Sequence, residues 1–203
     1  VQTTADPSVV ITNGIDGWPQ ASDISSTAAI VMETSTNTVL YSKNADQALY
    51  PASAVKVMTC LLALENSNLD DQVTMTATGV SGVTDGGANI SSQLDEVFTM
   101  EQCLYAIMVA SANDIALQVA EHIGGSVDAF VQTMNTRAQE LGCTNTVFTN
   151  PTGLPDENQH TTAHDMALIM ETAMENETFR TIAATTSYTL PATNVSGGER
   201  VLT

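Results

Sequence analysis

The sequence predicts an α+β fold, in which a short antiparallel sheet is followed by a buried helix and then by a cluster of helices. Three observations support this prediction. Residues 27–33 and 38–42 are rich in β-forming side chains and flank a polar turn. Residues 53–66 carry a long apolar run that begins just after a proline. Residues 99–180 contain repeated helix start and stop signals.

The first element is a β-hairpin, with TAAIVME at 27–33, TVLYS at 38–42 and a turn at 35–37. Because a two-stranded hairpin is marginal in water, it needs further strands or a covering helix. Residues 185–190 (TTSYTL) are one candidate for completing this sheet, and residues 201–203 are expected to begin another strand. We expect the C-terminal strands of the sheet to be missing from this chain.

The second element is a helix that starts after Pro51 and is almost wholly apolar over residues 57–64. Positions three apart on a helix share a face, so Ser53 and Lys56 point into the same space. A serine hydroxyl becomes a useful nucleophile when a base takes its proton. Burial favours the neutral form of a lysine, which is the form that can act as that base. From this stretch alone, a helix cap beside a surface lysine is the simpler interpretation.

The helical cluster has recognisable helix caps. Thr99 with Gln102 is a capping-box pattern, and it opens a helix through about Ala110. A break follows, and glycines or polar residues separate the later helices. The remaining expected caps are Asp114, Ser126 and Thr162, with stops at Gly124-Gly125 and Gly142.

The chain of 203 residues is long enough for one sizeable domain with a small subdomain. Residues 1–26 are polar and turn-rich, so we expect an irregular N-terminal segment. Residues 27–203 are expected to form the folded domain, with a mostly helical subdomain at about 67–180. Within it, residues 67–98 are expected to hold loops and short strands.

The composition excludes some classes of function. Hydrophobic residues make up 43 % of the chain, which predicts a packed core. The formal net charge is −18, with 23 acidic against five basic residues, so no basic surface for nucleic acid is expected. The same charge disfavours adhesion to an anionic membrane. No apolar run approaches the 18 residues of a transmembrane helix.

Neither the cysteines nor the histidines suggest a cofactor or a metal. The cysteines are three in number and widely spaced, so we expect small core residues, with a Cys60–Cys103 bridge left as an alternative. The histidines lack the spacing of zinc ligands. The residues concerned are Cys60, Cys103, Cys143, His122, His160 and His164.

A second polar motif, Ser111-Ala112-Asn113, lies in the break between two predicted helices. Such a break places side chains at a cavity wall, where a hydroxyl can relay a proton and an amide offers one acceptor and two donors. Alone, Ser-x-Asn is usually a turn or a cap. Together with Ser53-x-x-Lys56 it becomes specific.

With these two motifs, the chain resembles the serine D-Ala-D-Ala carboxypeptidases, which are low-molecular-weight penicillin-binding proteins. The resemblance runs from about residue 27 to about residue 178, and it implies the β-lactamase and penicillin-binding-protein-like transpeptidase fold. It includes PASAVKVMT at 51–59, ASANDIALQVAEHIGG at 110–125, NTVFTNPTGL at 145–154 and TTAHDMA at 161–167.

The resemblance implies a role for each residue of the two motifs. Ser53 would attack the D-Ala-D-Ala peptide bond and Lys56 would accept its proton. Ser111 would pass a proton to the leaving D-Ala, and Asn113 would hold the substrate amide. An acyl-enzyme would form and be hydrolysed by water, and β-lactams would trap it by mimicking the dipeptide.

The resemblance also implies partners and a location. The substrate would be a peptidoglycan stem peptide ending in D-Ala-D-Ala, which connects the protein with cell-wall synthesis and cell shape. Family members act outside the cytoplasmic membrane, secreted or anchored through a segment that lies outside this chain.

The family's third motif, Lys-Thr-Gly, does not occur in this sequence. We therefore expect a protein that truly ends at Thr203 to be inactive or nearly so. Two alternatives stay open. A class A β-lactamase shares the first two motifs, although residues 150–180 contain no Glu-x-x-x-Asn loop. A non-catalytic wall-binding pseudoenzyme is the other.

Overall fold

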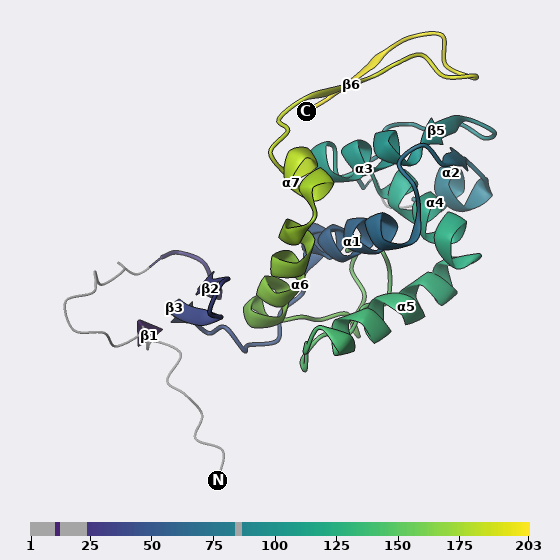
Figure 1. The fold of residues 1–203 in the computed structure, drawn as a ribbon. Coiled ribbons are helices and arrows are strands. Elements are labelled where there is room, and N and C mark those ends of the chain that lie inside the picture. Colours follow the sequence, from purple (N-terminus) through teal and green to yellow (C-terminus); the bar gives the residue numbers. More distant parts are fainter. Residues whose placement is uncertain (1–10, 13–23, 84–86) are drawn as a thin grey trace.

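The computed structural model describes residues 11–12, 24–83 and 87–203. Helices make up most of it, and a hairpin lies at either end of the described chain (Figure 1). The elements are β1 (Ile11–Thr12), β2 (Ala29–Glu33), β3 (Thr38–Lys43), the 3₁₀ helix η1 (Ala52–Val55), α1 (Lys56–Asn66), β4 (Gln72–Thr74), α2 (Ala77–Ser81), β5 (Val97–Thr99), α3 (Met100–Val109), α4 (Asn113–Gly124), α5 (Val127–Glu140), α6 (Ala163–Glu175), α7 (Glu177–Ala183), β6 (Tyr188–Leu190) and β7 (Arg200–Leu202).

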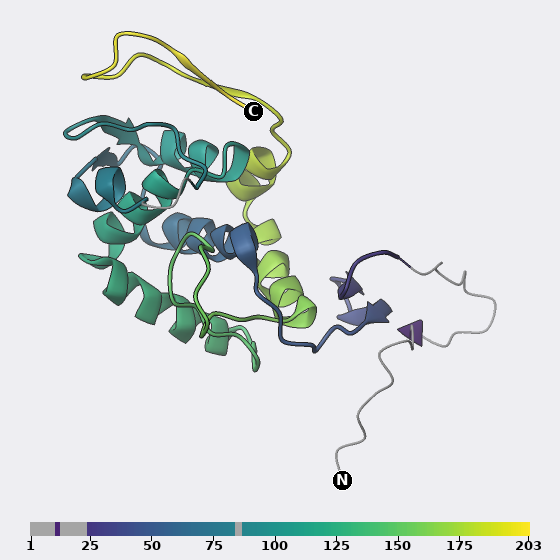
Figure 2. The same cartoon turned by 180° about the vertical axis from the view of Figure 1, so that it is seen from behind.

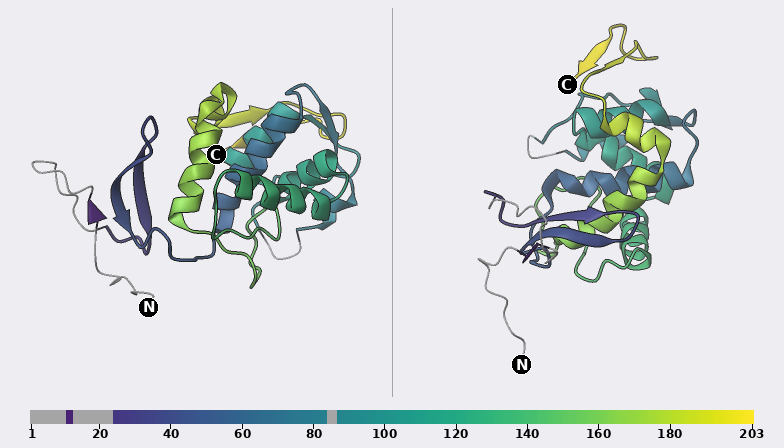
Figure 3. Two further views of the ribbon diagram at one scale, coloured as in Figure 1. Left: turned by 60° about the horizontal axis from the view of Figure 1, so that its bottom comes forward. Right: turned by 60° about the vertical axis from the view of Figure 1, so that its left-hand side comes forward.

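The predicted N-terminal hairpin is confirmed. Strands β2 and β3 pair antiparallel, and β1 pairs with the other edge of β3, giving the order β1-β3-β2. The turn is fixed by the Glu33 carboxylate, which accepts hydrogen bonds from Ser35 and Thr36. Asn37 completes it with a φ of 53°, which asparagine tolerates well. Helix α6 contacts β2, so the hairpin has a covering helix (Figure 3).

Residues 185–190 do contain a strand, but the expectation that they complete the N-terminal sheet is wrong. Strand β6 pairs antiparallel with β7, and the two form a separate hairpin at the opposite end of the molecule (Figure 1). Several contacts hold it there, and they include hydrogen bonds of Thr193 and Asn194 with the 95–97 segment, a ring stack and an ion pair. The Tyr188 ring stacks on Tyr105 of α3 with centroids 3.9 Å apart, and Arg200 pairs with the buried carboxylate of Glu96.

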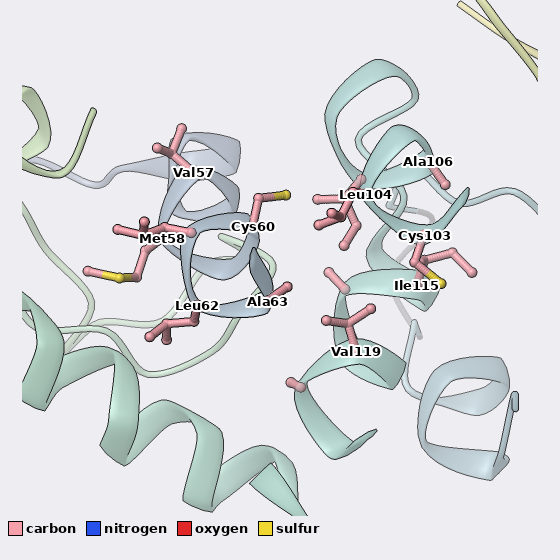
Figure 4. Packing of buried hydrophobic residues seen from close by; sticks show 14 of the residues in the cluster. Val57, Met58, Cys60, Leu62, Ala63, Cys103, Leu104, Ala106, Ile115 and Val119 are labelled. Carbon is pink, nitrogen blue, oxygen red and sulfur yellow. The ribbon is translucent and has the colours of Figure 1, made fainter. Parts of the chain in front are cut away.

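The hydrophobic core surrounds α1, whose residues from Lys56 to Ala63 are all buried. Figure 4 shows Cys60 of α1 pointing toward Leu104 of α3, with Ile115 and Val119 of α4 beside them. Helix α1 contacts α3, α4, α5, α6 and α7. This explains the apolar run after Lys56, since a helix packed on all sides has no solvent face on which to place polar residues.

Three of the four predicted helix caps are confirmed, with a full capping box at Thr99 and side-chain caps at Ser126 and Thr162. The expectation that Asp114 caps α4 is wrong, because the helix begins one residue earlier, at Asn113. The buried Asp114 carboxylate instead accepts hydrogen bonds from the N–H groups of Ile90 and Ser92 and from the Ser92 hydroxyl. It therefore holds the 90–92 loop against the start of α4.

The structure also bears on the expectations about the cysteines, the division of the chain, membrane helices and metal sites. All three cysteines are free and buried, which leaves the Cys60–Cys103 alternative without support. The predicted N-terminal segment, residues 1–26, lies mostly outside the described residues. The boundary between this segment and residues 27–203 therefore stays a prediction, and so does the helical subdomain at about 67–180. In the described ranges, no helix is long and apolar enough to cross a membrane, and no group of three or more His, Cys, Asp or Glu residues is placed to hold a metal ion.

The Arg200–Glu96 pair gives a test of how the C-terminal hairpin is held. Glu96 is fully buried, so Arg200→Leu leaves a buried carboxylate without its cation. We expect the free energy of unfolding to fall by about 3 kcal/mol, as measured by urea denaturation. The control is Arg137→Leu, which breaks partly exposed pairs with Glu65 and Glu140 and should cost about 1 kcal/mol or less. Equal losses in the two variants would show that the buried pair is not what anchors the hairpin.

Candidate active site

Ser53 and Lys56 are placed by a change of helix type. Ser53 lies exposed in η1, and Lys56 is the first residue of α1 and only 3 % exposed. The turn brings the two side chains together, with Lys56 Nζ 3.5 Å from Ser53 Oγ. This is the shared face that the spacing predicts, and the buried lysine excludes the simpler interpretation of a surface lysine.

The Lys56 amine lies in a desolvated setting. Burial lowers its pKa from the usual 10.5 to about 8, an effect that the nearby Cys60 thiol opposes slightly. Its Nζ donates a hydrogen bond of 2.5 Å to the carbonyl oxygen of Thr152. A neutral amine held by that bond still has its lone pair free to accept a proton, and Ser53 Oγ is the hydroxyl within reach.

The carbonyl that receives Lys56 belongs to a loop, residues 149–154, that is anchored from several sides. The Thr59 hydroxyl of α1 donates to the Pro151 carbonyl at 2.8 Å. Within the loop, Asn150 Oδ1 accepts the backbone N–H of Gly153 at 2.8 Å. The buried Gln159 side chain accepts from the N–H groups at the start of the loop. Figure 2 shows this green loop passing across α1.

Gly153 is the point of closest approach between this loop and the turn that carries Ser53. A Cβ at this position would lie 1.9 Å from the carbonyl oxygen of Ala52 and 2.9 Å from the backbone nitrogen of Ser53. Its φ of 82° is also one that side chains disfavour. Glycine is thus required here for both space and backbone conformation, and it fixes the loop directly against the serine.

The second motif approaches Ser53 from the other side. Ser111 lies in the break between α3 and α4, and its hydroxyl donates to Ser53 Oγ at 3.1 Å. Asn113 begins α4 and is 5 % exposed, and its buried Oδ1 has no hydrogen-bond partner among residues 24–83 and 87–203. A Cβ on Gly87 would lie 2.5 Å from Asn113 Nδ2, so this glycine gives the amide its room. An unpaired buried amide oxygen is uncommon in folded proteins, and it can accept a hydrogen bond from a ligand N–H.

Backbone strain marks both sides of the site. Ala52, next to the serine, has a φ of 48°, and Ser111 has a φ of 54°. Non-glycine residues in this left-handed region cost about 1–2 kcal/mol each. The surrounding contacts impose this conformation, as the Gly153 approach to Ala52 and the hydrogen bond of the Ala112 N–H to the Ala106 carbonyl show.

The structure therefore brings together all four residues that the sequence singled out. It adds Thr152, Gly153 and Gly87, which had no assigned role. One of these, Gly153, had a signal in the sequence, because Asn-Pro-Thr-Gly-Leu is a conspicuous turn with a glycine. Thr152 had no such signal in the sequence, because it contributes its backbone carbonyl and any residue at this position would supply the same atom.

The site has the geometry for nucleophilic acyl transfer. An exposed hydroxyl faces a buried amine of lowered pKa on one side and a second hydroxyl on the other. The amide of Asn113 borders the same space.

Comparison with known proteins agrees with this geometry. Residues 16–196 match the peptidase S11 family, described as D-alanyl-D-alanine carboxypeptidase. The chain is 37 % identical over 163 residues to D-alanyl-D-alanine carboxypeptidase DacF of Bacillus subtilis, covering 78 % of the chain and 41 % of that protein. It is 32 % identical over 191 residues to the D-alanyl-D-alanine carboxypeptidase of Streptomyces sp. strain K15, covering 88 % and 65 %. The chain thus spans about two fifths to two thirds of these relatives.

Solved structures give the same result. The Streptomyces K15 DD-transpeptidase superposes with a TM-score of 0.83 at 30 % identity, over 91 % of this chain and 74 % of that one. The D-alanyl-D-alanine carboxypeptidase of Mycobacterium tuberculosis H37Rv gives a TM-score of 0.82 at 30 % identity, over 92 % and 69 %. The expected α+β fold of the penicillin-binding-protein type is confirmed, and the chain belongs to the D-alanyl-D-alanine carboxypeptidase family of peptidases.

Proposed function

We propose that this chain carries the nucleophile, base and proton relay of a serine D,D-carboxypeptidase that removes the terminal D-Ala from peptidoglycan stem peptides. The observation that supports this most directly is the convergence on Ser53 Oγ of Lys56 Nζ at 3.5 Å and Ser111 Oγ at 3.1 Å. Ser111 lies 58 residues from Ser53 in the sequence, whereas Lys56 lies three residues from it. The relatives, named carboxypeptidases, support the same reaction.

The reaction follows from the positions of these groups. Lys56 takes the Ser53 hydroxyl proton while Thr152 O holds the amine, and Ser53 Oγ attacks the carbonyl carbon between the two D-Ala residues. The Ser53 N–H, in the first turn of the helix, offers a hydrogen bond to the developing oxyanion. Ser111 delivers the proton to the departing D-Ala amine. Water then hydrolyses the ester and returns Ser53.

Asn113 fits the role of substrate holder. Its buried Oδ1 lacks a partner within the part of the chain that the structure describes, and a substrate backbone N–H would supply one. The substrate's terminal carboxylate needs a cation, and Lys56 is already engaged as the base. We propose that this group is bound by the third motif of the fold. About a quarter of the K15 structure has no counterpart in these 203 residues.

We propose that the reaction takes place outside the cytoplasm, at the bacterial cell wall, as is expected for this family and this substrate. β-Lactams are the expected inhibitors, because they present a reactive amide that acylates the same serine. Secretion and a part in cell shape belong to the same proposal.

Acylation by a fluorescent penicillin tests the nucleophile. We expect the natural protein that contains this sequence to be labelled, and Ser53→Ala to lower the labelling rate by at least about 100-fold. Ser187→Ala, in the exposed loop before β6, is the matched control and should label normally. Absence of labelling in the unmodified protein would favour a non-catalytic wall-binding role, and rapid release of hydrolysed penicillin would favour a β-lactamase.

The lowered pKa of Lys56 predicts a pH dependence. Below pH 8 the amine is mostly protonated and cannot accept the serine proton, and above pH 8 it is mostly neutral. The acylation rate should therefore rise between about pH 7 and pH 9 and then level off. In stopped-flow measurements, Lys56→Arg should lower the plateau about 10²- to 10⁴-fold, because arginine keeps its proton at these pH values. A flat profile in the unmodified protein would rule out Lys56 as the base.

Gly153→Ala tests the contact between the loop and the serine turn. The new Cβ would overlap the Ala52 carbonyl, so the loop or the turn must shift. We expect the acylation rate to drop at least about tenfold and the free energy of unfolding to fall by about 1–3 kcal/mol. Gly197→Ala is the control, because a Cβ there meets nothing within 4 Å. Normal acylation in Gly153→Ala would mean that the loop does not position Ser53.

A further inference from the structure

Thr59 carries a buried hydroxyl to which the proposed reaction gives no part. It lies in α1 among apolar side chains and is 0 % exposed. A hydroxyl in such a place needs a hydrogen bond, because burying it unpaired is costly. On a helix that bond commonly goes back to the carbonyl four residues earlier. Thr59 Oγ1 instead donates to the carbonyl oxygen of Pro151 at 2.8 Å, across 92 positions of the sequence.

Thr59 and Lys56 bind the same stretch of the 149–154 loop, which passes across α1 (Figure 2). The two residues are three positions apart on the helix, so they share a face. Their side chains donate to consecutive carbonyls, those of Pro151 and Thr152. The peptide that joins these two residues is planar and the proline ring fixes its own φ, so little freedom separates the two carbonyls. Holding the first carbonyl therefore limits where the second can lie.

The position of the second carbonyl matters because the Lys56 amine is carried on a flexible stem. Its Nζ lies 3.5 Å from Ser53 Oγ and 2.5 Å from the Thr152 carbonyl oxygen. The closer contact thus sets where the lone pair of the neutral amine points. A shift of that carbonyl would carry the amine away from the hydroxyl, and a misplacement of about 1 Å can cost about 100-fold in rate.

The rest of the loop has anchors that do not depend on Thr59. The buried Gln159 side chain accepts hydrogen bonds from the N–H groups at the start of the loop. Gly153 lies directly against the turn that carries the serine. Removal of the Thr59 hydroxyl is therefore expected to leave the loop in place and to loosen only the carbonyls at its centre.

We propose that Thr59 is a positioning residue for the base of the reaction. Its hydroxyl holds the Pro151–Thr152 segment of the loop, and that segment directs the Lys56 amine at the nucleophile. Thr59 thus acts from the core, through the loop, on the alignment of the base. The proposal rests on the proposed function, because it takes Lys56 as that base.

Stopped-flow acylation of the natural protein that contains this sequence, with a fluorescent penicillin, tests the proposal. Thr59→Val keeps the shape of the side chain and removes the hydroxyl. We expect the maximal acylation rate to fall at least about tenfold, and the dissociation constant of the first, non-covalent complex to stay within about twofold. Thr59→Ala also lacks the hydroxyl and cannot crowd the loop, so it should show the same loss. Thr59→Ser keeps the donor and should remain within about threefold of the unmodified rate.

A double variant with Lys56→Met distinguishes positioning of the base from a general structural role. Methionine has an unbranched stem and no amine, so the Pro151–Thr152 segment has nothing left to direct. In this background, Thr59→Val should change the residual rate by less than about twofold. The matched control is Thr172→Val, which removes a hydroxyl that donates to the Leu168 carbonyl in α6 at 3.2 Å and should leave the rate unchanged.

The outcomes separate this proposal from the proposed function. If the unmodified protein is not labelled, the proposed function fails, and with it the part of Thr59 in the reaction. If the unmodified protein is labelled, three results would each overturn the role of Thr59 and leave the proposed function standing. These are a normal rate in Thr59→Val and Thr59→Ala, a loss that appears only as weaker non-covalent binding, and an equal loss of rate in the Lys56→Met background.

Discussion

The contact on which the rest of the site depends is the hydrogen bond from Lys56 Nζ to the Thr152 carbonyl. It joins the central helix to the 149–154 loop and gives a buried amine one polar partner. Without that partner, the cost of burying the amine would be much larger, because an unpaired polar group in the interior loses its hydration with no compensation. The same bond leaves the amine directed at Ser53.

The burial of that amine is a property of the whole helical body. Helix α1 is surrounded by five other helices, so its first turn is dry even though Ser53, three residues earlier, is exposed. The change from η1 to α1 is where the chain passes from solvent into the core. The exposed Ser53 hydroxyl thus lies next to a buried amine because of where the helix enters the protein, and not because of any single side chain.

Much of this arrangement could be predicted from the sequence, for reasons that differ by residue. Ser53 and Lys56 share a turn, so local helix geometry relates them. Ser111 comes from a distant segment, and its approach to Ser53 could be inferred only through the family resemblance. Asp114 has the composition of a cap but binds the 90–92 loop, because tertiary partners outcompeted the local backbone.

The failure to place strand β6 has a similar cause. Its β-forming residues predict a strand but contain no information about which edge it joins. The position of β6 depends on the Tyr188–Tyr105 ring stack and on the Arg200–Glu96 ion pair. The partners in these contacts lie about 80 and 100 positions apart in the sequence. Pairing partners of this kind are decided by long-range packing.

The left-handed backbone at Ala52 and Ser111 has a consequence for how this protein can evolve. Glycine at either position would relieve the strain in the folded state, yet at position 52 it would make the backbone beside Ser53 more flexible, and at position 111 it would also remove the hydroxyl that contacts Ser53. Selection for a more heat-resistant protein and selection for a faster one would therefore act on these two positions in opposite directions.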